Sequence, residues 1–518
     1  MKDWNLPPSW ALAPLDLLAE INPRPVALPA SEASPTHFVP MRAVCEEFGG
    51  IDVSARKPLV EVKKGYTAFH AGDVLFAKIT PCMENGKLAL VPPLEEGVGF
   101  GSTEFHVVRA RTGVTPRWLA YFLSQAQFRK FARQHMTGTA GQMRVATSWL
   151  SQTPLTVAPT KEQTRIVDKL EELLSDLDAG VAELKAAQKK LAQYRQSLLK
   201  AAVEGRLTEA WRALHGEPEE SGAQLLARIL RERRARWEAK QLAKLEAQGK
   251  APPKGWQDIY EETATVDAKA LPKLPQGWVW ARAEQLCDFI TKGTTPPKGL
   301  DGGSSKAVPF LRVTNLTSDG ALNLDDKVFV SEHIHRGFLA RSVVYPGDVL
   351  MNIVGPPLGQ VSVVPLTFAE WNINQAIAIF RAVNGVSSRF MSLCLLSAPA
   401  QAWLAAKAKT TAGQTNLTLE VCRDLPVALP PVTEQHEIAQ AIDSIFAGLL
   451  DQDAAIAAAL RQSAAQRKNI LQAAFSGQLV PQDPNDEPAS VLLARIRAER
   501  AARIGAATKR GRKTQALS

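Results

Sequence analysis

The chain has 518 residues, more than one globular domain usually holds, and its 45% hydrophobic and 22% charged residues match an ordinary soluble protein. No apolar run approaches the ~18 residues that cross a bilayer, and no signal peptide is visible, so we expect a cytoplasmic protein. The five cysteines lack C-x-x-C spacing, which argues against a zinc site or a disulfide framework, and the net charge of +9 favours a polyanionic partner.

Residues 1–158 are predicted to form a mixed α/β domain. Short runs rich in β-branched and aromatic residues, separated by glycine and proline, indicate strands. A helix is expected from Pro116 to His135, where apolar residues recur at helical spacing. The predicted strands are Leu59–Val62, Val74–Ile79, Leu88–Val91, Phe105–Val108 and Leu155–Ala158.

Residues 159–207 are predicted to form one long helix. Apolar or small residues recur in steps of four and three from Ile166 to Ala201, which is the 3.5-residue period of a coiled-coil seam. A proline precedes the stretch and a glycine follows it, as is usual at the ends of a helix. Thr160 and Gln163 have the spacing of a capping box. A helix of about 42 residues spans roughly 60 Å.

Residues 208–270 are predicted to be a charged linker that contains an exposed helix. Arginine and glutamate are dense from residue 223 to residue 248, and prolines interrupt regular structure after it. Its segment Leu225-Leu-Ala-Arg-Ile229 recurs near the C-terminus as Leu492-Leu-Ala-Arg-Ile496.

The second half of the chain repeats the first. The Glu-Gln pair at 162–163 recurs at 434–435, and Thr139-Ala-Gly-Gln142 recurs as Thr411-Ala-Gly-Gln414, both at an offset of 272 residues. The opening Leu6-Pro-Pro-Ser-Trp10 likewise recurs as Leu274-Pro-Gln-Gly-Trp278. We therefore predict a second globular domain at 271–431 with a helix from Phe390 to Lys409, a second long helix at 432–480, and a C-terminal helix with a disordered basic tail at 481–518.

A single narrow apolar seam on so long a helix has to be buried. The other copy is the most economical partner, so we expect an antiparallel intramolecular pair whose seam includes Tyr194, Gln452 and Gln466. The alternative is that each seam packs on its own globular domain. The predicted fold class is α/β (α+β): two globular domains separated by two long antiparallel coiled-coil helices, with a pseudo-twofold internal repeat.

Motifs for catalysis are scarce. There is no G-x-x-x-x-G-K-[ST] sequence for nucleotide phosphates. Asp52, Glu61 and Lys63 have the spacing of a metal-dependent nuclease, in which carboxylates hold Mg²⁺ and lysine supports the attacking water. A Glu-x-Lys triplet also arises by chance in a chain of this composition, and the second half has no equivalent. We therefore expect no catalytic residue and no metal site in this chain.

Polar residues of both halves suit nucleic acid, because Arg and Lys fit phosphates and guanine edges while Asn and Gln fit adenine edges. The Thr-Ala-Gly-Gln loops stand out because they occur at equivalent places; a loop that docks the domain onto its helix is the other interpretation. The candidate DNA-binding residues are Lys78, Asn85, Lys87, Arg109, Arg133, Thr139, Gln142, Arg144, Lys292, Thr294, Lys298, Arg312, Thr314, Asn315, Asn352, Asn374, Gln375, Lys409 and Gln414.

The chain resembles the specificity (S) subunit of type I restriction-modification enzymes over nearly its whole length. The resemblance rests on the two Thr-Ala-Gly-Gln loops and on a frame of proline, Glu-Gln, long helix and Gly-x-Leu that occurs twice. The first copy spans LTVAPTKEQTRIVDKL from Leu155 and SLLKAAVEGRL from Ser197; the second spans LPVALPPVTEQHEIAQAI from Leu425 and ILQAAFSGQL from Ile470. The long linker at 208–270 departs from some members of that family.

The resemblance implies a function. Each globular half would be a target recognition domain that reads one half-site of a bipartite, asymmetric double-stranded DNA target, with the helices as spacer. Two modification subunits, which bind S-adenosylmethionine and methylate adenine, and two restriction subunits, which use ATP and Mg, would assemble with this non-catalytic chain, which would hold no cofactor. The alternatives are the nuclease considered above and a coiled-coil scaffold that does not bind DNA.

Overall fold

The computed structural model describes residues 6–25, 28, 31–95, 97–139, 141–296, 307–317, 320–411 and 414–515. The chain divides into two compact units, each of which contains one globular domain and one end of each long helix. Unit 1 consists of residues 1–185 and 456–518, and unit 2 of residues 186–455. No helix in the described ranges is long and apolar enough to cross a membrane.

Unit 1 is built on two four-stranded sheets, ordered β2-β9-β6-β7 and β4-β3-β8-β5, and on the pair β1-β10. The strands are β1 Ala11–Pro14, β2 Ala19–Ile21, β3 Pro35–Val39, β4 Arg56–Pro58, β5 Thr67–His70, β6 Val74–Ala77, β7 Leu88–Leu90, β8 Val98–Gly101, β9 Phe105–Ala110 and β10 Pro154–Val157. Its helices are α1 Leu15–Leu18, α2 Leu59–Val62, α3 Pro116–Ser124, α4 Ala126–Gln134, α5 Thr147–Gln152 and α15 Ala489–Gln515.

Unit 2 repeats the first sheet as β12-β19-β15-β17 and the strand pair as β11-β22, and adds β14-β13-β18 and β16-β21-β20. The strands are β11 Val279–Arg282, β12 Cys287–Lys292, β13 Ala307–Leu311, β14 Val328–Ser331, β15 Val349–Asn352, β16 Val354–Gly355, β17 Val361–Val363, β18 Asn372–Ile373, β19 Ile377–Ala382, β20 Lys409–Thr411, β21 Gln414–Asn416 and β22 Pro426–Leu429. The helices are α7 Glu209–His215, α8 Gly222–Ala247, α9 Ala283–Leu286, α10 Glu332–Arg336, α11 Ser388–Leu396, α12 Ala398–Lys407 and α13 Leu419–Asp424.

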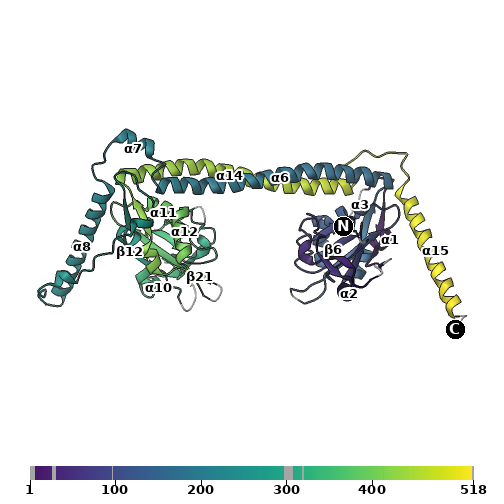
Figure 1. Cartoon of the computed structure of the whole chain (residues 1–518), viewed down its shortest axis with the longest axis horizontal. Helices are drawn as coiled ribbons and strands as arrows, with labels where there is room; N and C mark the ends of the chain where they lie inside the picture. Colours follow the sequence, from purple (N-terminus) through teal and green to yellow (C-terminus); the bar gives the residue numbers. More distant parts are fainter. Residues whose placement is uncertain are drawn as a thin grey trace. The chain divides into compact units, whose positions relative to one another are not determined.

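The two long helices are α6, Thr160–Val203, and α14, Val432–Phe475. They pair in antiparallel fashion within each unit (Figure 1). In unit 1 Asp178 of α6 and Arg467 of α14 form an ion pair, and in unit 2 Arg195 of α6 lies 2.7 Å from Asp453 of α14. The fold class predicted from the repeat, including the antiparallel pair, is confirmed.

Three residues predicted to lie in the apolar seam between the long helices do not lie there. Tyr194 is 50% exposed, and Gln452 and Gln466 are exposed as well. At each place the residue one position later is half-buried instead, and it is one of the charged residues of the ion pairs above. The predicted seam residues before and after each of these positions remain buried or half-buried, so the departures are local. At each one, the charged neighbour turns toward the other helix to form its ion pair.

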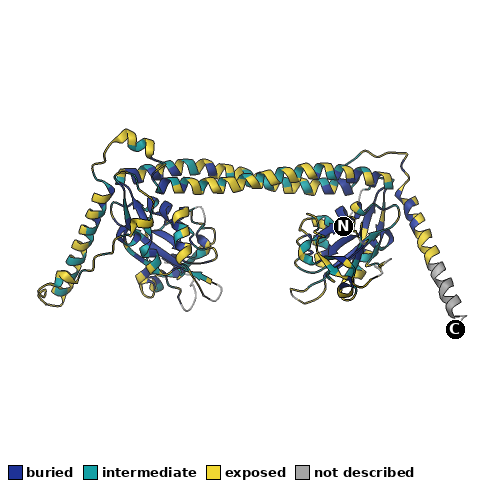
Figure 2. Cartoon of the chain, in the orientation of Figure 1, coloured by how far each residue is buried: buried dark blue, intermediate teal, exposed yellow. Residues whose placement is uncertain are grey.

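Both ways of burying the seam occur. At the start of α6, Ile166, Leu170 and Leu174 belong to the core of unit 1, together with Leu471 and Phe475 of α14. Ile438 and Ile442 of α14 and Leu199 of α6 belong in the same way to the core of unit 2. Figure 2 shows the middle of the pair with exposed outer faces and the ends in dark blue. Each helix end is therefore part of a globular core.

The side chains of Thr160 and Gln163, predicted to form a capping box, instead attach the start of α6 to the globular domain of unit 1. Gln163 accepts a hydrogen bond from the backbone N–H of Thr115 at 2.9 Å and donates to the carbonyl of Ala158 at 2.8 Å. Thr160 donates its hydroxyl hydrogen to the carbonyl of Gly113 at 2.9 Å. The capping box is therefore wrong, because both side chains satisfy loop groups of the domain.

Equivalent contacts fix the start of α14. Gln435 accepts from the N–H of Ser387 at 2.8 Å and donates to the carbonyls of Gly385 and Pro430. The neighbouring glutamates are buried too: Glu162 accepts from the indole N–H of Trp10 at 3.1 Å, and Glu434 from that of Trp278 at 2.7 Å. In each unit, the Glu-Gln pair and the repeated tryptophan thus attach the start of the long helix to the globular domain.

Three local predictions were wrong. Leu59–Val62 is the helical turn α2, because Leu59 and Val62, three positions apart, are both buried on one side. The predicted helix from Pro116 to His135 breaks at Gln125, whose ψ of 132° is extended, and α4 folds back on α3. The predicted helix from Phe390 to Lys409 breaks at Ser397, whose hydroxyl accepts from the N–H of Ala400 and caps α12.

The segments after the long helices also differ from expectation. Leu225 and Ile229 of α8 are buried in the core of unit 2, so the predicted linker begins as a docked helix. Leu492 and Ile496 of α15 are buried in the core of unit 1 in the same way. The C-terminal tail predicted to be disordered continues α15 to Gln515. A helix anchored by its first turns extends more readily than an isolated one, because the nucleus is already formed.

Candidate nucleic-acid interface

One corner of the unit 1 sheet brings three segments together: the end of β6, the start of β9 and the hairpin that follows α4. The backbone of Lys78, directly after β6, donates to the carbonyl of Glu104 at 2.9 Å and accepts from the N–H of Val145 at 2.9 Å. Arg144 of the hairpin is bridged both to Ile79 and to Thr137. The first Thr-Ala-Gly-Gln loop is the tip of this hairpin.

The same corner exists in unit 2. The N–H of Ile353 donates to Ala376 at 2.8 Å, and its carbonyl accepts from Leu417 at 2.9 Å. The hairpin is β20-β21, in which Asn416 pairs with Lys409 and, across to β16, with Val354. The backbone of the corner is therefore built to one plan in both units.

The side chains at the two corners are different. Lys78 of unit 1 corresponds to the buried Ile353 of unit 2, and Arg144 corresponds to Asn416. In unit 1 the guanidinium of Arg144 donates hydrogen bonds of 2.8 and 2.9 Å to the carboxylate of Glu104. This bond from Arg144 holds the pKa of Glu104 below its ordinary value, and the charge of Lys78 adds to the effect. Unit 2 has Ala376 in place of the acid, so the ion pair of the unit 1 corner has no counterpart in unit 2, where Asn416 lies beside Lys409.

About half of the candidate DNA-binding residues are exposed, so a nucleic acid could reach them. In unit 1 the exposed Asn85 donates to Glu46 at 2.8 Å and Arg133 pairs with Glu84 at 2.8 Å. The exposed set is Asn85, Arg133, Thr139, Gln142, Lys292, Thr314, Gln375, Lys409 and Gln414. Lys298 lies outside the described residues.

The other candidates are tied into the fold to different degrees. Lys78, Lys87, Thr294 and Asn374 are half-buried; Lys87 donates to the carbonyl of Met41 at 3.3 Å, Thr294 accepts from Arg341 at 3.1 Å and Asn374 accepts from the N–H of Ala376 at 3.2 Å. Arg312 pairs with Asp326 at 2.5 Å. A competing phosphate would have to displace these partners.

Two of the candidates are buried amides whose hydrogen bonds stay within the chain. Asn315 donates to the carbonyl of Asn323 at 2.9 Å and accepts from the N–H of Arg312 at 2.8 Å. Asn352 donates to the carbonyl of Pro357 and accepts from the N–H of Val354 at 3.1 Å. Buried amides of this kind shape loops, because their donors and acceptors are already used.

Arg109 is part of a repeated structural ion pair. It holds the buried Asp73 with two hydrogen bonds of 2.7 Å, and Arg381 holds Asp348 in unit 2 in the same way, at 2.8 and 2.6 Å. The hydrogen bonds that Arg109 donates to the Asp73 carboxylate raise the pKa of Arg109. Because the pair is the same in both units, it supports the common fold.

Sequence reasoning missed the polar residues beside the unit 2 hairpin tip. The hydroxyls of Thr410 and Thr415 lie 3.2 Å apart across β20-β21, and Asn416 follows them. Their positions next to Lys409 and Gln414 could have indicated them, because a short polar run around a glycine loop is typical of a hairpin.

The residues of the nuclease interpretation do not come together. Asp52 accepts from the N–H of Ser54 at 2.9 Å, Glu61 lies 3.8 Å from Lys57, and Lys63 pairs with Glu32. Among the described residues, no group of three or more His, Cys, Asp or Glu side chains could hold a metal ion. The three side chains thus have local structural partners.

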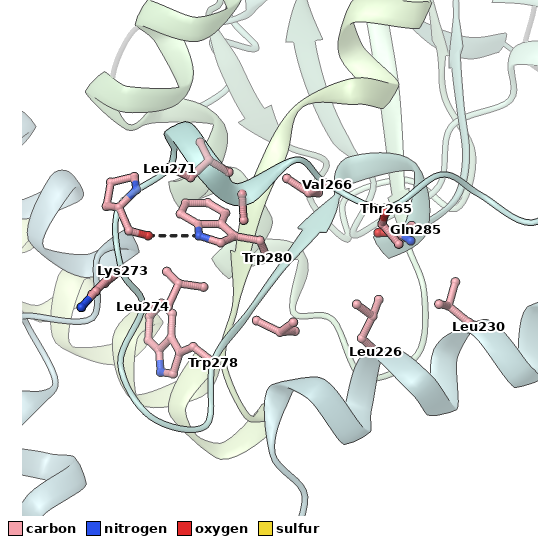
Figure 3. Close-up of a pocket in the computed structure, with 13 residues that line it drawn as sticks. Leu226, Leu230, Thr265, Val266, Leu271, Lys273, Leu274, Trp278, Trp280 and Gln285 are labelled. Carbon is pink, nitrogen blue, oxygen red and sulfur yellow. Dashed lines mark hydrogen bonds between the residues drawn. The ribbon is translucent and has the colours of Figure 1, made fainter.

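Unit 2 contains a mainly apolar pocket. It has a volume of about 620 Å³ and lies between α8, the segment that returns from it, and β11. Figure 3 shows Leu226 and Leu230 of α8 across from Trp278 and Trp280, whose indole N–H donates to the carbonyl of Pro272 at 3.2 Å. Lys273 is its one charged lining residue, so the pocket offers no acid–base pair for a reaction.

Comparison with known proteins agrees with this architecture. Residues 275–460 match the family described as the type I restriction modification DNA specificity domain. The chain is 27% identical over 492 residues to the EcoEI specificity subunit of a type I restriction enzyme from Escherichia coli, covering 86% of this chain and 79% of that subunit. It is also 27% identical over 443 residues to the E. coli EcoAI specificity subunit, covering 76% and 71%.

A solved structure concerned with complex assembly and conformational transition of the type I R-M system shares the fold. One of its chains matches with a TM-score of 0.61 at 20% identity, covering 92% of this chain and 100% of that one. Specificity subunits of this family bind no cofactor themselves. Residues 275–460 thus carry a type I restriction modification DNA specificity domain, and in its repeated sheet-rich domains, its paired long helices and its sequence the chain is similar to type I specificity subunits, the non-catalytic part of the complex that supplies its DNA specificity.

Proposed function

We propose that this subunit reads a bipartite, asymmetric DNA target. The domains at 1–158 and 271–431 each bind one half-site, and the long helices, within 159–207 and 432–480, act as the spacer between them. One observation supports this most directly: the two corners share their backbone hydrogen bonds, while Lys78, Glu104 and Arg144 of unit 1 are replaced in unit 2 by Ile353, Ala376 and Asn416. A common scaffold with unlike reading surfaces recognises two unlike half-sites, because base readout depends on side chains at the groove.

The reading residues that we propose are the accessible candidates at the hairpins and nearby loops. In unit 1 Gln142 lies exposed at the hairpin tip, with Lys78 and Arg144 at its base. In unit 2 Lys409 and Gln414 flank the equivalent tip. An amide suits an adenine edge and a lysine suits guanine or phosphate. Asn315, Asn352 and Arg109 keep these surfaces in shape instead of contacting bases.

The chain is part of a type I restriction-modification complex with DNA. We propose that two modification subunits, which bind S-adenosylmethionine and methylate adenine, dock on it, and that two restriction subunits using ATP and Mg complete a cytoplasmic assembly. The exposed outer faces of α6 and α14 support this, because a two-helix pair leaves most of its surface free for further helices (Figure 2).

The direct test is to map methylated adenines in DNA from cells that express the complete complex. We expect one motif with two different half-sites and unspecified bases between them. Replacing residues 1–158 by the equivalent domain of another specificity subunit should change one half-site and leave the other. Gln142→Ala should relax only the half-site read by unit 1, and Gln414→Ala, its matched control, only the other. A motif that changes in both halves, or a single continuous motif, would contradict the proposal.

A further inference from the structure

The excess positive charge of this chain lies in two helices outside the sequence-reading surfaces. α8 contains seven basic and three acidic residues, and α15 contains eight basic residues and one acidic residue. Their net charges of +4 and +7 give +11, whereas the whole chain has +9. The rest of the protein therefore carries a net charge of −2. The net positive charge of the chain is therefore concentrated in these two helices.

The two helices are equivalent elements of the repeat. Each follows the end of a long helix and is anchored in its own unit by its first turns, through Leu225 and Ile229 in α8 and through Leu492 and Ile496 in α15. Beyond the anchor α8 is predominantly exposed, and α15 is exposed over residues 497–503 (Figure 2). Both exposed basic stretches therefore follow directly from a docked helical base.

Some of these cations have carboxylate partners and others have none. Arg228, Arg234 and Arg236 of α8 are paired with acids, as are Arg495, Arg500 and Arg503 of α15. In the part of the chain that the structure describes, no acidic group lies within ion-pair distance of the exposed Arg231, Lys240 and Lys244 of α8 or of Arg497 of α15. Like charges on neighbouring turns destabilise a helix, so a polyanion alongside would stabilise these segments.

We propose that α8 and α15 bind the phosphate backbone of DNA, beside the two half-sites and independently of sequence. The inference rests on the DNA-binding function of the subunit and adds a surface to it. A protein partner fits α15 less well, because residues 497–503 are only arginine, alanine and one glutamate, and protein interfaces need apolar anchors at their centre. Phosphate contacts supply affinity, while base contacts supply specificity.

The test is the salt dependence of binding by the full-length chain to a DNA duplex of random sequence, measured by fluorescence anisotropy. Each phosphate contact contributes about 0.9 to the slope of log K against log salt. Neutralising five basic residues of α15 should lower the slope by at least about 2, out of about 4.5 if all five contact phosphates. The variant carries R497Q, K509Q, R510Q, R512Q and K513Q.

The matched control removes the same charge from the exposed faces of α6 and α14 and should leave the slope unchanged. It carries K185Q, K189Q, K190Q, R461Q and K468Q. A separate α8 variant, with R231Q, K240Q and K244Q, should lower the slope by about 1 to 2. It provides an independent test if the α15 variant is less helical, which circular dichroism would reveal.

Equal slopes for the wild type and both helix variants, or an equal loss in the control, would overturn the proposal. With the methylated motif in hand, the preference for target over random DNA should stay the same in the α8 and α15 variants; a collapse of this preference would place these helices in base reading and also contradict it. If the proposed bipartite reading of DNA is wrong, the methylated motif will not have two parts. The salt slopes on random-sequence DNA can still be measured in that case, so the two failures are distinguishable.

Discussion

Replacing the two buried glutamates that begin the long helices by glutamine should affect stability very differently, because their hydrogen-bond donors are arranged differently. Both donors to Glu162 reach the same oxygen: the indole N–H of Trp10 lies 3.1 Å and the amide of Gln482 2.6 Å from Oε1. A glutamine with its oxygen in that place keeps both bonds. We therefore expect Glu162→Gln to change the free energy of unfolding by less than about 0.5 kcal/mol at neutral pH, or to raise it.

Glu434 uses both of its oxygens. Thr208, at 2.6 Å, and Arg212 donate to Oε1, and Trp278 donates to Oε2 at 2.7 Å. Glutamine offers one acceptor and turns its NH₂ toward a donor, and it leaves the Arg212 guanidinium, whose side chain is only 21% exposed, without its carboxylate. One donor loses its acceptor and the partly buried ion pair is lost. Together these losses cost about 2–4 kcal/mol, which is the destabilisation that we expect for Glu434→Gln.

The effect of Glu162→Gln should depend on pH. Burial raises the pKa of Glu162 above its ordinary value, against the opposing bonds from Trp10 and Gln482. The native state therefore binds the proton more tightly than the unfolded state, so wild-type stability is lost as the pH rises from the unfolded pKa, about 4.3, through the raised native pKa. The variant lacks this loss, so its stability relative to the wild type should rise over that window and then level off.

Urea unfolding followed by hydrogen exchange on peptides from the starts of α6 and α14 would measure the two effects separately. Adding Arg212→Met to Glu434→Gln removes the guanidinium that has lost its carboxylate and should recover about 1 kcal/mol or more. Equal destabilisation by the two glutamine variants, or no recovery in the double variant, would refute the reasoning that donor arrangement decides the outcome.

Three further outcomes follow from the same contacts. Gln163→Ala and Gln435→Ala should each cost about 2–3 kcal/mol and increase hydrogen exchange at the start of their own long helix only, since each amide bonds two or more buried loop groups. Arg109→Gln should lower the free energy of unfolding by about 3 kcal/mol, because it leaves Asp73 buried without its cation, yet keep the salt slope of DNA binding; a changed slope would mean that it contacts phosphate. Deleting one heptad from both long helices removes about 10 Å and should shorten the spacer of the methylated motif by about three base pairs, and an unchanged spacer would refute its role as a ruler.

Much of the architecture could be predicted from the sequence because it is duplicated. A constant offset of 272 residues for the Glu-Gln pairs and the Thr-Ala-Gly-Gln loops implies two copies of one unit, and an unbroken 3.5-residue period implies a long paired helix. The role of the Glu-Gln pairs was not predictable, because their partners, such as Trp10 and Ser387, lie 48 or more residues away in the chain.

In the candidate interface, too, the sequence indicated some features and the structure decided others. Composition and repeat position indicated the polar residues at the two hairpins, but burial separated Asn352 and Asn315 from Gln142 and Gln414, and only the ion pair with Asp73 identified Arg109 as structural. By itself the sequence determined the number of units, the helical pairing and the family, because these are carried by local periodicity and repetition. Tertiary structure decided which polar groups are already satisfied inside the protein and which are exposed, since that depends on contacts between segments distant in the chain.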